Sequence, residues 1–215
     1  MKRLMLFTIT VVFIVLITSA GWYASGSLHS TKQNAGTSTK KAITGETIPA
    51  KIKTCAIAAK RFTSANKFNT QVCFLIDMNI ESGKDRFFVY DMKSDSVLTT
   101  GLVTHGSCHQ NWLTGRKYGN TVGCGCTSLG KYKIGNPYYG RFGLAYKLYG
   151  LDTSNSHAYD RFVVLHSMQC VAEDEVYPYP ICQSDGCPAV SPGFLEKLAS
   201  MINLSSRPVL LWIVD

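Results

Sequence analysis

Charged residues are scarce in this sequence, and the dense basic patches of nucleic-acid-binding proteins are missing. Charged residues make up 17% of the 215 residues, and the net charge of +8 is split evenly, with +4 in residues 1–50 and +4 in the remainder. No cluster of lysine and arginine with interleaved aromatic residues occurs, which argues against nucleic acid as a partner. Hydrophobic residues make up 46% of the chain, so disorder over most of its length is also excluded.

The N-terminus lacks the cysteine that a lipoprotein signal places directly after its apolar run. Lys2 and Arg3 precede an apolar stretch that reaches Ala24, a pattern typical of an export signal. Residues 1–24 are therefore predicted to be either a signal peptide, cleaved after Ala20, or an uncleaved membrane anchor, since ~20 apolar residues span a bilayer. We favour the anchor. Both interpretations predict an extracytoplasmic location, in the periplasm or cell envelope.

Internal repeats are also absent, and the chain after Ala24 divides into two parts by composition. Residues 25–50 are rich in Ser, Thr, Gly and Lys, cannot bury apolar surface, and are predicted to form a flexible linker. Residues 51–215 are long enough for one domain with a full core. In this organisation the N-terminal segment alone contacts the membrane.

Hydrophobic patterning predicts a mainly β domain with two short helices. Apolar residues recur at helical spacing over 52–62 and again over 192–202, where Ser191 is suited to cap the helix and Pro192 to its first position. Short apolar or β-branched runs, separated by turns, predict strands. They cover residues 72–77, 86–91, 96–103, 130–134, 144–148, 159–166 and 209–214.

The chain has eight cysteines, which fits an exported protein. They are Cys55, Cys73, Cys108, Cys124, Cys126, Cys170, Cys182 and Cys187. In an oxidising compartment most of them are expected to pair, although sequence alone leaves the connectivity open. A bridge between Cys170 and Cys182 would close the base of the loop between them.

Two histidines lie among three of these cysteines, which raises the question of a metal site. His105 and His109 flank Cys108, and Cys124-Gly125-Cys126 follows. The single residue between Cys124 and Cys126 does not match the spacing of zinc sites, which place two to four residues between paired cysteines. A disulfide or a packed loop is the favoured interpretation, and no metal is predicted.

The strongest chemical signal combines a cysteine in a tight turn with a histidine at the end of an apolar run. Ser184-Asp185-Gly186-Cys187-Pro188 forms the turn, in which the N–H groups of Gly186 and Cys187 can point at a developing oxyanion. His166 ends the run, and a neutral imidazole there can take the thiol proton. Ser167 is the nearest group able to hold its tautomer. The alternatives are a structural disulfide cysteine and a core histidine.

These residues resemble the L,D-transpeptidases of bacterial cell walls, in particular the murein L,D-transpeptidase catalytic-domain branch. That branch has a Ser-x-Gly-Cys-Pro-Ala-Val turn, and residues 184–190 match it in full. Similar stretches occur in order at residues 76–84, 88–91, 101–107, 127–130 and 150–151. The resemblance covers roughly residues 70–215 and implies a β-sandwich or barrel-like catalytic fold that needs no cofactor.

The resemblance also implies a reaction and a site. Cys187 attacks a peptidoglycan stem peptide, a thioacyl-enzyme forms, and an amine of a second stem takes the acyl group. His166 acts as base and then as acid, and Gly186, Ser184 and Ser167 support the geometry. His105 borders the cleft. Tyr177 and Tyr179 lie in the loop 171–183, which is either a lid over the peptide or an ordinary surface loop.

Three positions depart from the family pattern. Asp185 replaces the histidine of the broader family's turn, and Pro188-Ala189 stand where that family has an arginine–asparagine pair after the cysteine. Gln183 occupies the position where the branch usually has an arginine. These departures leave the binding of the substrate carboxylate unassigned by resemblance.

Three other functions fit the same residues. Water as acceptor would make the protein an L,D-carboxypeptidase. A cysteine peptidase or amidase acting on wall peptides is a second alternative, although such enzymes often place the cysteine before the histidine. The third is a non-catalytic wall-binding module in which Cys187 is locked in a disulfide.

Overall fold

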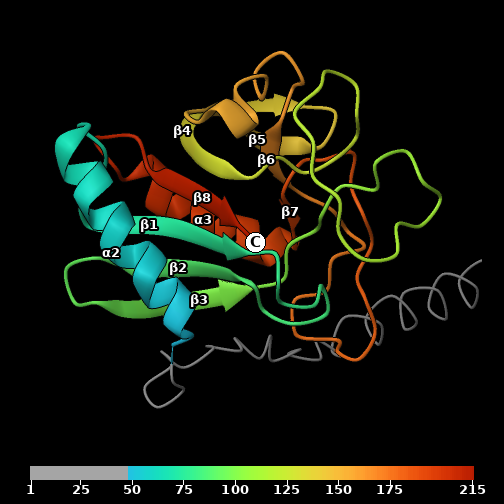
Figure 1. Cartoon of the computed structure of the whole chain (residues 1–215). Helices are drawn as coiled ribbons and strands as arrows, with labels where there is room; N and C mark the ends of the chain where they lie inside the picture. The colour runs from blue at the N-terminus through green and yellow to red at the C-terminus, as the bar shows by residue number, and fades with distance from the viewer. Residues whose placement is uncertain (1–47) are drawn as a thin grey trace, which may run out of the picture. The chain divides into compact units, whose positions relative to one another are not determined.

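One mixed β-sheet organises the part of the chain that the computed structural model describes, residues 48–215 (Figure 1). Eight strands in this part pair in the order β3-β2-β1-β8-β4-β5-β6-β7. The strands are β1 Val72–Asp77, β2 Phe87–Asp91, β3 Ser96–Gly101, β4 Gly130–Gly140, β5 Gly143–Gly150, β6 Val164–Ser167, β7 Ala189–Val190 and β8 Leu210–Val214. The helices are α2 Ala50–Ala65, α3 Pro192–Asn203 and the 3₁₀ turn η1 Thr153–Asn155.

The predicted signal peptide or anchor lies outside the described residues, as does nearly all of the predicted linker. Within residues 48–215 no helix is both long and apolar enough to cross a membrane. The first described helix begins at Ala50, close to the predicted start of the domain.

Local hairpins build one half of the sheet, and the C-terminal strand joins it to the other half. β1, β2 and β3 pair antiparallel in chain order, as their turn-separated patterns predict. β8 lies between β1 and β4, parallel to the first and antiparallel to the second. A parallel neighbour needs a long crossover, and here the chain between β1 and β8 contains all the other strands.

Two helices cover opposite faces of β1 (Figure 1). Ile52, Ala56 and Ala59 of α2 are buried against the face that carries Cys73 and Leu75. The other face carries Phe74 and Ile76, which belong to the same core as the α3 residues Phe194 and Leu198. Successive side chains of a strand point to opposite faces, so an uninterrupted apolar strand requires cover on both.

A single core also joins the two ends of the sheet. Phe74 and Phe87 from β1 and β2 share one buried cluster with Tyr146 of β5, Leu165 of β6 and Val190 of β7. Residues of β4, β8 and α3 belong to the same cluster and connect its two ends. The prediction of a mainly β fold with an N-terminal helix and a helix after Cys187 is therefore confirmed.

The predicted strand over residues 159–166 is wrong in its first half. Strand β6 begins at Val164, and the residues before it form turns closed by hydrogen bonds from Arg161 N–H to His157 O and from Phe162 N–H to Tyr159 O. Phe162 has φ of +55° and is 81% exposed, a backbone conformation that no strand contains. β4 is also longer than predicted, continuing to Gly140 across a register shift.

Candidate active site

The cysteine turn is held by a network centred on Ser184. The Ser184 N–H donates to His105 O at 2.9 Å, and the Ser184 carbonyl accepts from Ser107 N–H at 2.8 Å. Its hydroxyl donates to Cys187 O at 2.6 Å and accepts from Gly186 N–H at 3.2 Å. Ser184 thus closes the turn across three residues and ties it to the segment after β3.

Glycine is required at position 186 for two reasons. Its φ is +101°, in the region that favours glycine. A Cβ built there would also lie 2.4 Å from the carbonyl oxygen of Cys126. The cysteine turn therefore rests directly on the backbone of a distant loop.

Thr104 holds the other side of Cys187. Its hydroxyl donates to Cys187 O at 3.2 Å and accepts from Ala189 N–H at 3.0 Å, while its own N–H donates to Ala189 O at 2.9 Å. Thr104 is fully buried. Thr104 lies in the stretch 101–107 that resembles the family, but its long-range hydrogen bonds leave no local signal in the sequence.

Strand pairing brings His166 next to the cysteine turn. In the parallel pair of β6 and β7, His166 lies opposite Ala189, two residues after Cys187. Neighbouring strands lie ~4.8 Å apart, so this register brings the backbone of His166 close to the segment that carries Cys187. Cys187 itself lies in the bend that leads into β7, at the same end of the strand pair as His166.

The environment of His166 favours a neutral imidazole of defined tautomer. Nδ1 lies 2.9 Å from Ser167 O, and because a carbonyl can only accept, Nδ1 carries the proton and Nε2 is free to accept one. Burial is the main effect on the pKa of His166 and lowers it, opposed by the Ser167 carbonyl. Phe142 stacks on the imidazole with ring centroids 4.1 Å apart. The predicted role of Ser167 thus falls to its carbonyl group.

The thiol of Cys187 is unbridged and half-buried. Sγ lies 3.8 Å from the carbonyl oxygen of Phe162, to which it donates. Burial raises the pKa of Cys187 above its ordinary value, and Asp185 raises it further, whereas the backbone of Val164 and the charge of Arg161 lower it. The resting thiol is therefore protonated near neutral pH and needs a base to become a nucleophile.

Arg161 joins three segments around the cysteine. Its guanidinium donates to Gly119 O at 2.9 Å, to the hydroxyl of Ser128 and to Cys126 O. The same cation lowers the pKa of Cys187. Arg161 carries no signal in the sequence: it falls in the predicted strand 159–166, and its partners are more than 30 residues away in the chain.

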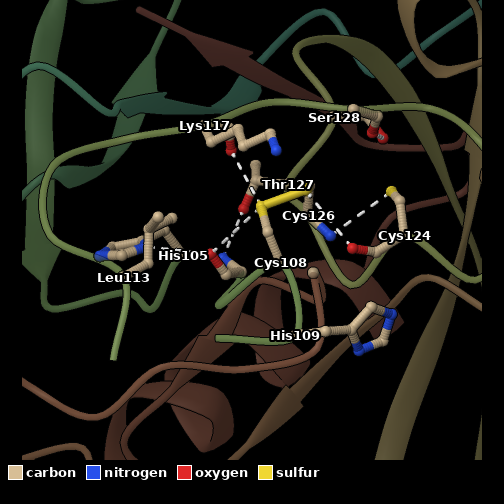
Figure 2. The surroundings of a disulfide bond; sticks show 12 residues. His105, Cys108, His109, Leu113, Lys117, Cys124, Cys126, Thr127 and Ser128 are labelled. Carbon is tan, nitrogen blue, oxygen red and sulfur yellow. Dashed lines mark hydrogen bonds between the residues drawn. A yellow bond between two sulfur atoms is a disulfide. The ribbon is translucent and has the colours of Figure 1, made fainter. Parts of the chain in front are cut away.

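A disulfide fixes the loop on which the cysteine turn rests. Cys108 and Cys126 are bridged, and Figure 2 shows the sulfur of Cys124 beside this bridge, where it accepts from Cys126 N–H at 3.5 Å. The labelled residues of Figure 2 come from the loop between β3 and β4. Within residues 48–215 no group of three or more His, Cys, Asp and Glu side chains is arranged to hold a metal ion.

Fewer cysteines pair than expected. Besides Cys108–Cys126, the predicted bridge between Cys170 and Cys182 is present, which leaves Cys55, Cys73, Cys124 and Cys187 free. Cys73 is wholly buried between α2 and the sheet, and its burial raises its pKa to about 12. It packs as a small apolar side chain rather than as a disulfide partner.

The loop 171–183 is fastened at several points. Its Glu173 accepts from the Ser191 hydroxyl at 2.7 Å and from Gly193 N–H at 2.8 Å, at the start of α3. Glu175 accepts from Asp85 N–H at 2.8 Å, and Val171 and Ile181 are buried with Leu102 in a small core. These contacts describe a fixed wall rather than a free flap.

A cavity of about 450 Å³ opens beside the cysteine turn. His105, Tyr179 and Gln183 are among its lining residues, so two of the predicted cleft residues meet there. Tyr177 faces Lys84 instead, with Nζ 3.9 Å from the ring centroid. The Gln183 side chain donates to Leu113 O at 2.9 Å and accepts from Leu113 N–H at 3.0 Å, which secures the cavity wall.

One family model matches most of the chain. Residues 45–211 match the family model described as the L,D-transpeptidase catalytic domain. No curated protein matches the chain. Among solved structures, an L,D-transpeptidase from Xylanimonas cellulosilytica is 12% identical, with a TM-score of 0.38 over 72% of this chain and 68% of that one.

A second similar structure is the helical cell shape determining protein Pgp2 from Campylobacter jejuni, as its K307A mutant. It is 14% identical, with a TM-score of 0.37 over 78% of this chain and 57% of that one. The chain thus spans little more than half of the Pgp2 structure.

Proposed function

This chain belongs to the family of L,D-transpeptidase catalytic domains, and from that premise we propose that it is a cysteine-dependent L,D-transpeptidase acting on peptidoglycan stem peptides. One observation carries the proposal. A buried histidine, held in its Nδ1–H tautomer by Ser167 O, is paired by strand register with the segment that carries an unbridged cysteine. An imidazole able to take the thiol proton is what a nucleophilic cysteine requires, and this supports the proposal.

The reaction begins with a proton transfer. Nε2 of His166 takes the proton of the Cys187 thiol, and the thiolate attacks the amide carbonyl of the donor stem, which precedes its terminal residue. The C–N bond breaks, the leaving amine takes the proton from His166, and a thioester remains on Cys187. The amine of a second stem then attacks the thioester, giving up a proton to His166, and the thiol is restored.

Backbone N–H groups of the turn stabilise the tetrahedral oxyanion in this scheme. Gly186 N–H already donates to Ser184 Oγ at 3.2 Å, so Cys187 N–H is the principal donor and Gly186 the second. Ser184 and Thr104 hold the carbonyl of Cys187, which fixes the orientation of the adjoining peptide groups. Such prearranged donors are worth about 10²–10³ in rate each.

The departures at positions 185 and 188 are compatible with this scheme. Asp185 is exposed, and its negative charge raises the pKa of the Cys187 thiol. The thiol then needs a base to lose its proton, and His166 has that role in the scheme. Pro188 has no N–H, and the flanking Ala189 N–H is already bonded to Thr104. Neither position removes a group that the chemistry uses.

The acceptor distinguishes the proposed activity from its nearest alternative. An amine acceptor gives a cross-link, whereas water gives L,D-carboxypeptidase activity from the same thioester. A non-catalytic wall-binding module with Cys187 in a disulfide is disfavoured because Cys187 is a free thiol.

An extracytoplasmic location is part of the proposal. Two disulfides are typical of proteins that fold in an oxidising compartment. Residues 1–24 supply the export signal or anchor and residues 25–50 the linker, and the membrane is contacted only through this N-terminal segment.

The test is incubation of the protein with a stem tetrapeptide, followed by mass analysis of protein and products. We expect a thioacyl adduct on Cys187 and a cross-linked peptide dimer, with loss of both in Cys187→Ala. Cys124→Ala is the control, because it removes another free thiol near the turn and should retain the adduct. A Cys187→Ala protein that turns over at the rate of the unmodified chain would refute the mechanism.

A further inference from the structure

The cavity beside the cysteine turn is built from three loops and is rich in positive charge. Its lining comes from residues 79–86 after β1, residues 105–116 after β3, and the end of the loop 171–183. Two arginines, Arg86 and Arg116, line it together with His105. The proposed mechanism uses none of these three side chains.

Arg86 is a buried cation without a carboxylate partner among the described residues. It is 1% exposed, and its guanidinium donates only to backbone carbonyls, to Val103 O at 2.9 and 2.7 Å and to Ile80 O at 3.1 Å. Burial lowers its pKa to about 10, so the side chain remains charged at neutral pH. A guanidinium has five N–H donors, and a buried charge left without a counter-ion is costly.

Arg116 and His105 face the same space. Arg116 donates to Asn79 O at 2.7 Å, and the charges of Arg86 and Arg116 both lower the pKa of His105, after burial. Glu81 is the one carboxylate among the lining residues; it is exposed and paired with Lys84 at 3.2 Å, and its pKa is lowered by a backbone hydrogen bond and by Lys84, and to a smaller extent by the charge of Arg116. Asp77, which acts on Arg86 from a distance, is bonded to Lys51 at 2.8 Å.

We propose that this cavity binds a carboxylate of the peptide substrate, with Arg116 and Arg86 as its charged partners. Arginine presents a planar fork of donors that matches a carboxylate. Trp112 and Tyr179, which are 50% and 74% exposed, line the same cavity and offer flat apolar surfaces to the rest of the peptide. The proposal rests on the proposed function and adds to it the residues that select an anionic peptide.

The position of the cavity suits a peptide that reaches the nucleophile. Gln183 lines the cavity and precedes Cys187 by four residues, a span of at most about 14 Å of chain. An extended peptide of about four residues covers the same distance. One carboxylate can therefore lie in the part of the cavity that Gln183 lines while an amide carbonyl of the same peptide reaches Cys187.

The experiment measures peptide binding by calorimetry to the full chain carrying Cys187→Ala, which prevents turnover. The probes are a stem tetrapeptide with free carboxylates and the same peptide with its carboxylates amidated. We expect Arg116→Gln to weaken binding of the free peptide about tenfold or more, the usual effect of losing a charge-assisted hydrogen bond. The amidated peptide should bind more weakly, and its affinity should not change with Arg116→Gln.

Arg207→Gln is the matched control. It removes the same charge from an exposed position between α3 and β8, outside the cavity, and should leave both affinities unchanged. Arg116→Lys should keep part of the affinity, because it keeps the charge but loses the fork. Arg86→Lys should also weaken binding of the free peptide and leave binding of the amidated peptide unchanged. This variant is compared only if its thermal unfolding midpoint stays near that of the parent.

The outcomes separate this proposal from the proposed function. If Arg116→Gln leaves binding of the free peptide unchanged, or weakens both peptides equally, the carboxylate site is refuted even if Cys187 is acylated in the wild-type chain. If the loss is confined to the free peptide, the site stands even where wild-type Cys187 forms no adduct, and the proposed function alone then fails.

Discussion

At the scale of single residues, the site depends on positions where one backbone approaches another. Gly186 lies over the carbonyl of Cys126, and that carbonyl also accepts from Arg161, the cation that lowers the pKa of Cys187. One peptide group thus sets both the shape of the cysteine turn and the position of its nearest positive charge. A change at Gly186 is therefore expected to act on folding and chemistry together.

We predict that Gly186→Ala destabilises the domain and abolishes acylation of Cys187. An alanine at positive φ costs about 1 kcal/mol, and the clash with Cys126 O adds a further penalty because a backbone oxygen cannot rotate away. Gly123→Ala is the control, since Gly123 also has positive φ but a Cβ there meets nothing within 4 Å. Denaturant unfolding and adduct mass measure both effects. Equal losses in the two variants would show that the contact with Cys126 is unimportant.

At the scale of elements, the β4–β5 hairpin covers the base. Its tip places Phe142 on the His166 ring, and β5 pairs with β6 so that Ala145 lies opposite His166. Desolvation is the largest effect on the pKa of His166, and it favours the neutral imidazole. The hairpin thus keeps the base unprotonated at pH values where an exposed histidine would begin to charge.

We predict that Phe142→Ala moves the acidic limb of acylation to higher pH. In the wild type the pKa of His166 lies below its ordinary 6.5, so activity should persist below pH 6.5 and disappear only as pH falls through that lowered value. Without Phe142 the imidazole gains water, its pKa rises toward 6.5, and activity is lost at higher pH.

Tyr139→Ala provides the control for this prediction. Tyr139 belongs to the same hairpin, is 84% exposed and has no ring contact with His166 among the described residues. The rate of adduct formation is measured from pH 5 to pH 8 by quenching the reaction and weighing the protein by mass spectrometry. In Tyr139→Ala the midpoint of this pH profile should equal that of the wild type. A Phe142→Ala profile that also keeps that midpoint would mean that the ring does not control protonation of His166.

At the scale of the whole molecule, the sequence predicts the secondary-structure elements that a local residue pattern specifies. It does not predict the strand pairings and hydrogen bonds that form between distant segments. Continuous apolar runs identified β1 and β8, but their parallel pairing and the position of β8 beside β4 depend on the complete sheet. The turn at Phe162 was missed because phenylalanine is a residue type that favours strands, whereas here it has a left-handed backbone in a turn closed by its N–H to Tyr159 O. The Ser-x-Gly-Cys turn was found because its residue types are themselves unusual, whereas the partners of Arg161 come from loops far along the chain.

The two disulfides should contribute alike to stability but differently to activity. Each closes a short loop, with sequence separations of 18 and 12, so removal of either is expected to cost about 3 kcal/mol of unfolding free energy. Cys108–Cys126 fixes the loop under Gly186, whereas Cys170–Cys182 closes a loop that is also held by Glu173 and Glu175. Cys108→Ser with Cys126→Ser should therefore slow acylation far more than Cys170→Ser with Cys182→Ser. Denaturant unfolding measures the loss of stability, and the rate of adduct formation is compared under conditions in which both double variants remain folded. Equal slowing in the two double variants would show that the loop under the turn needs no covalent support.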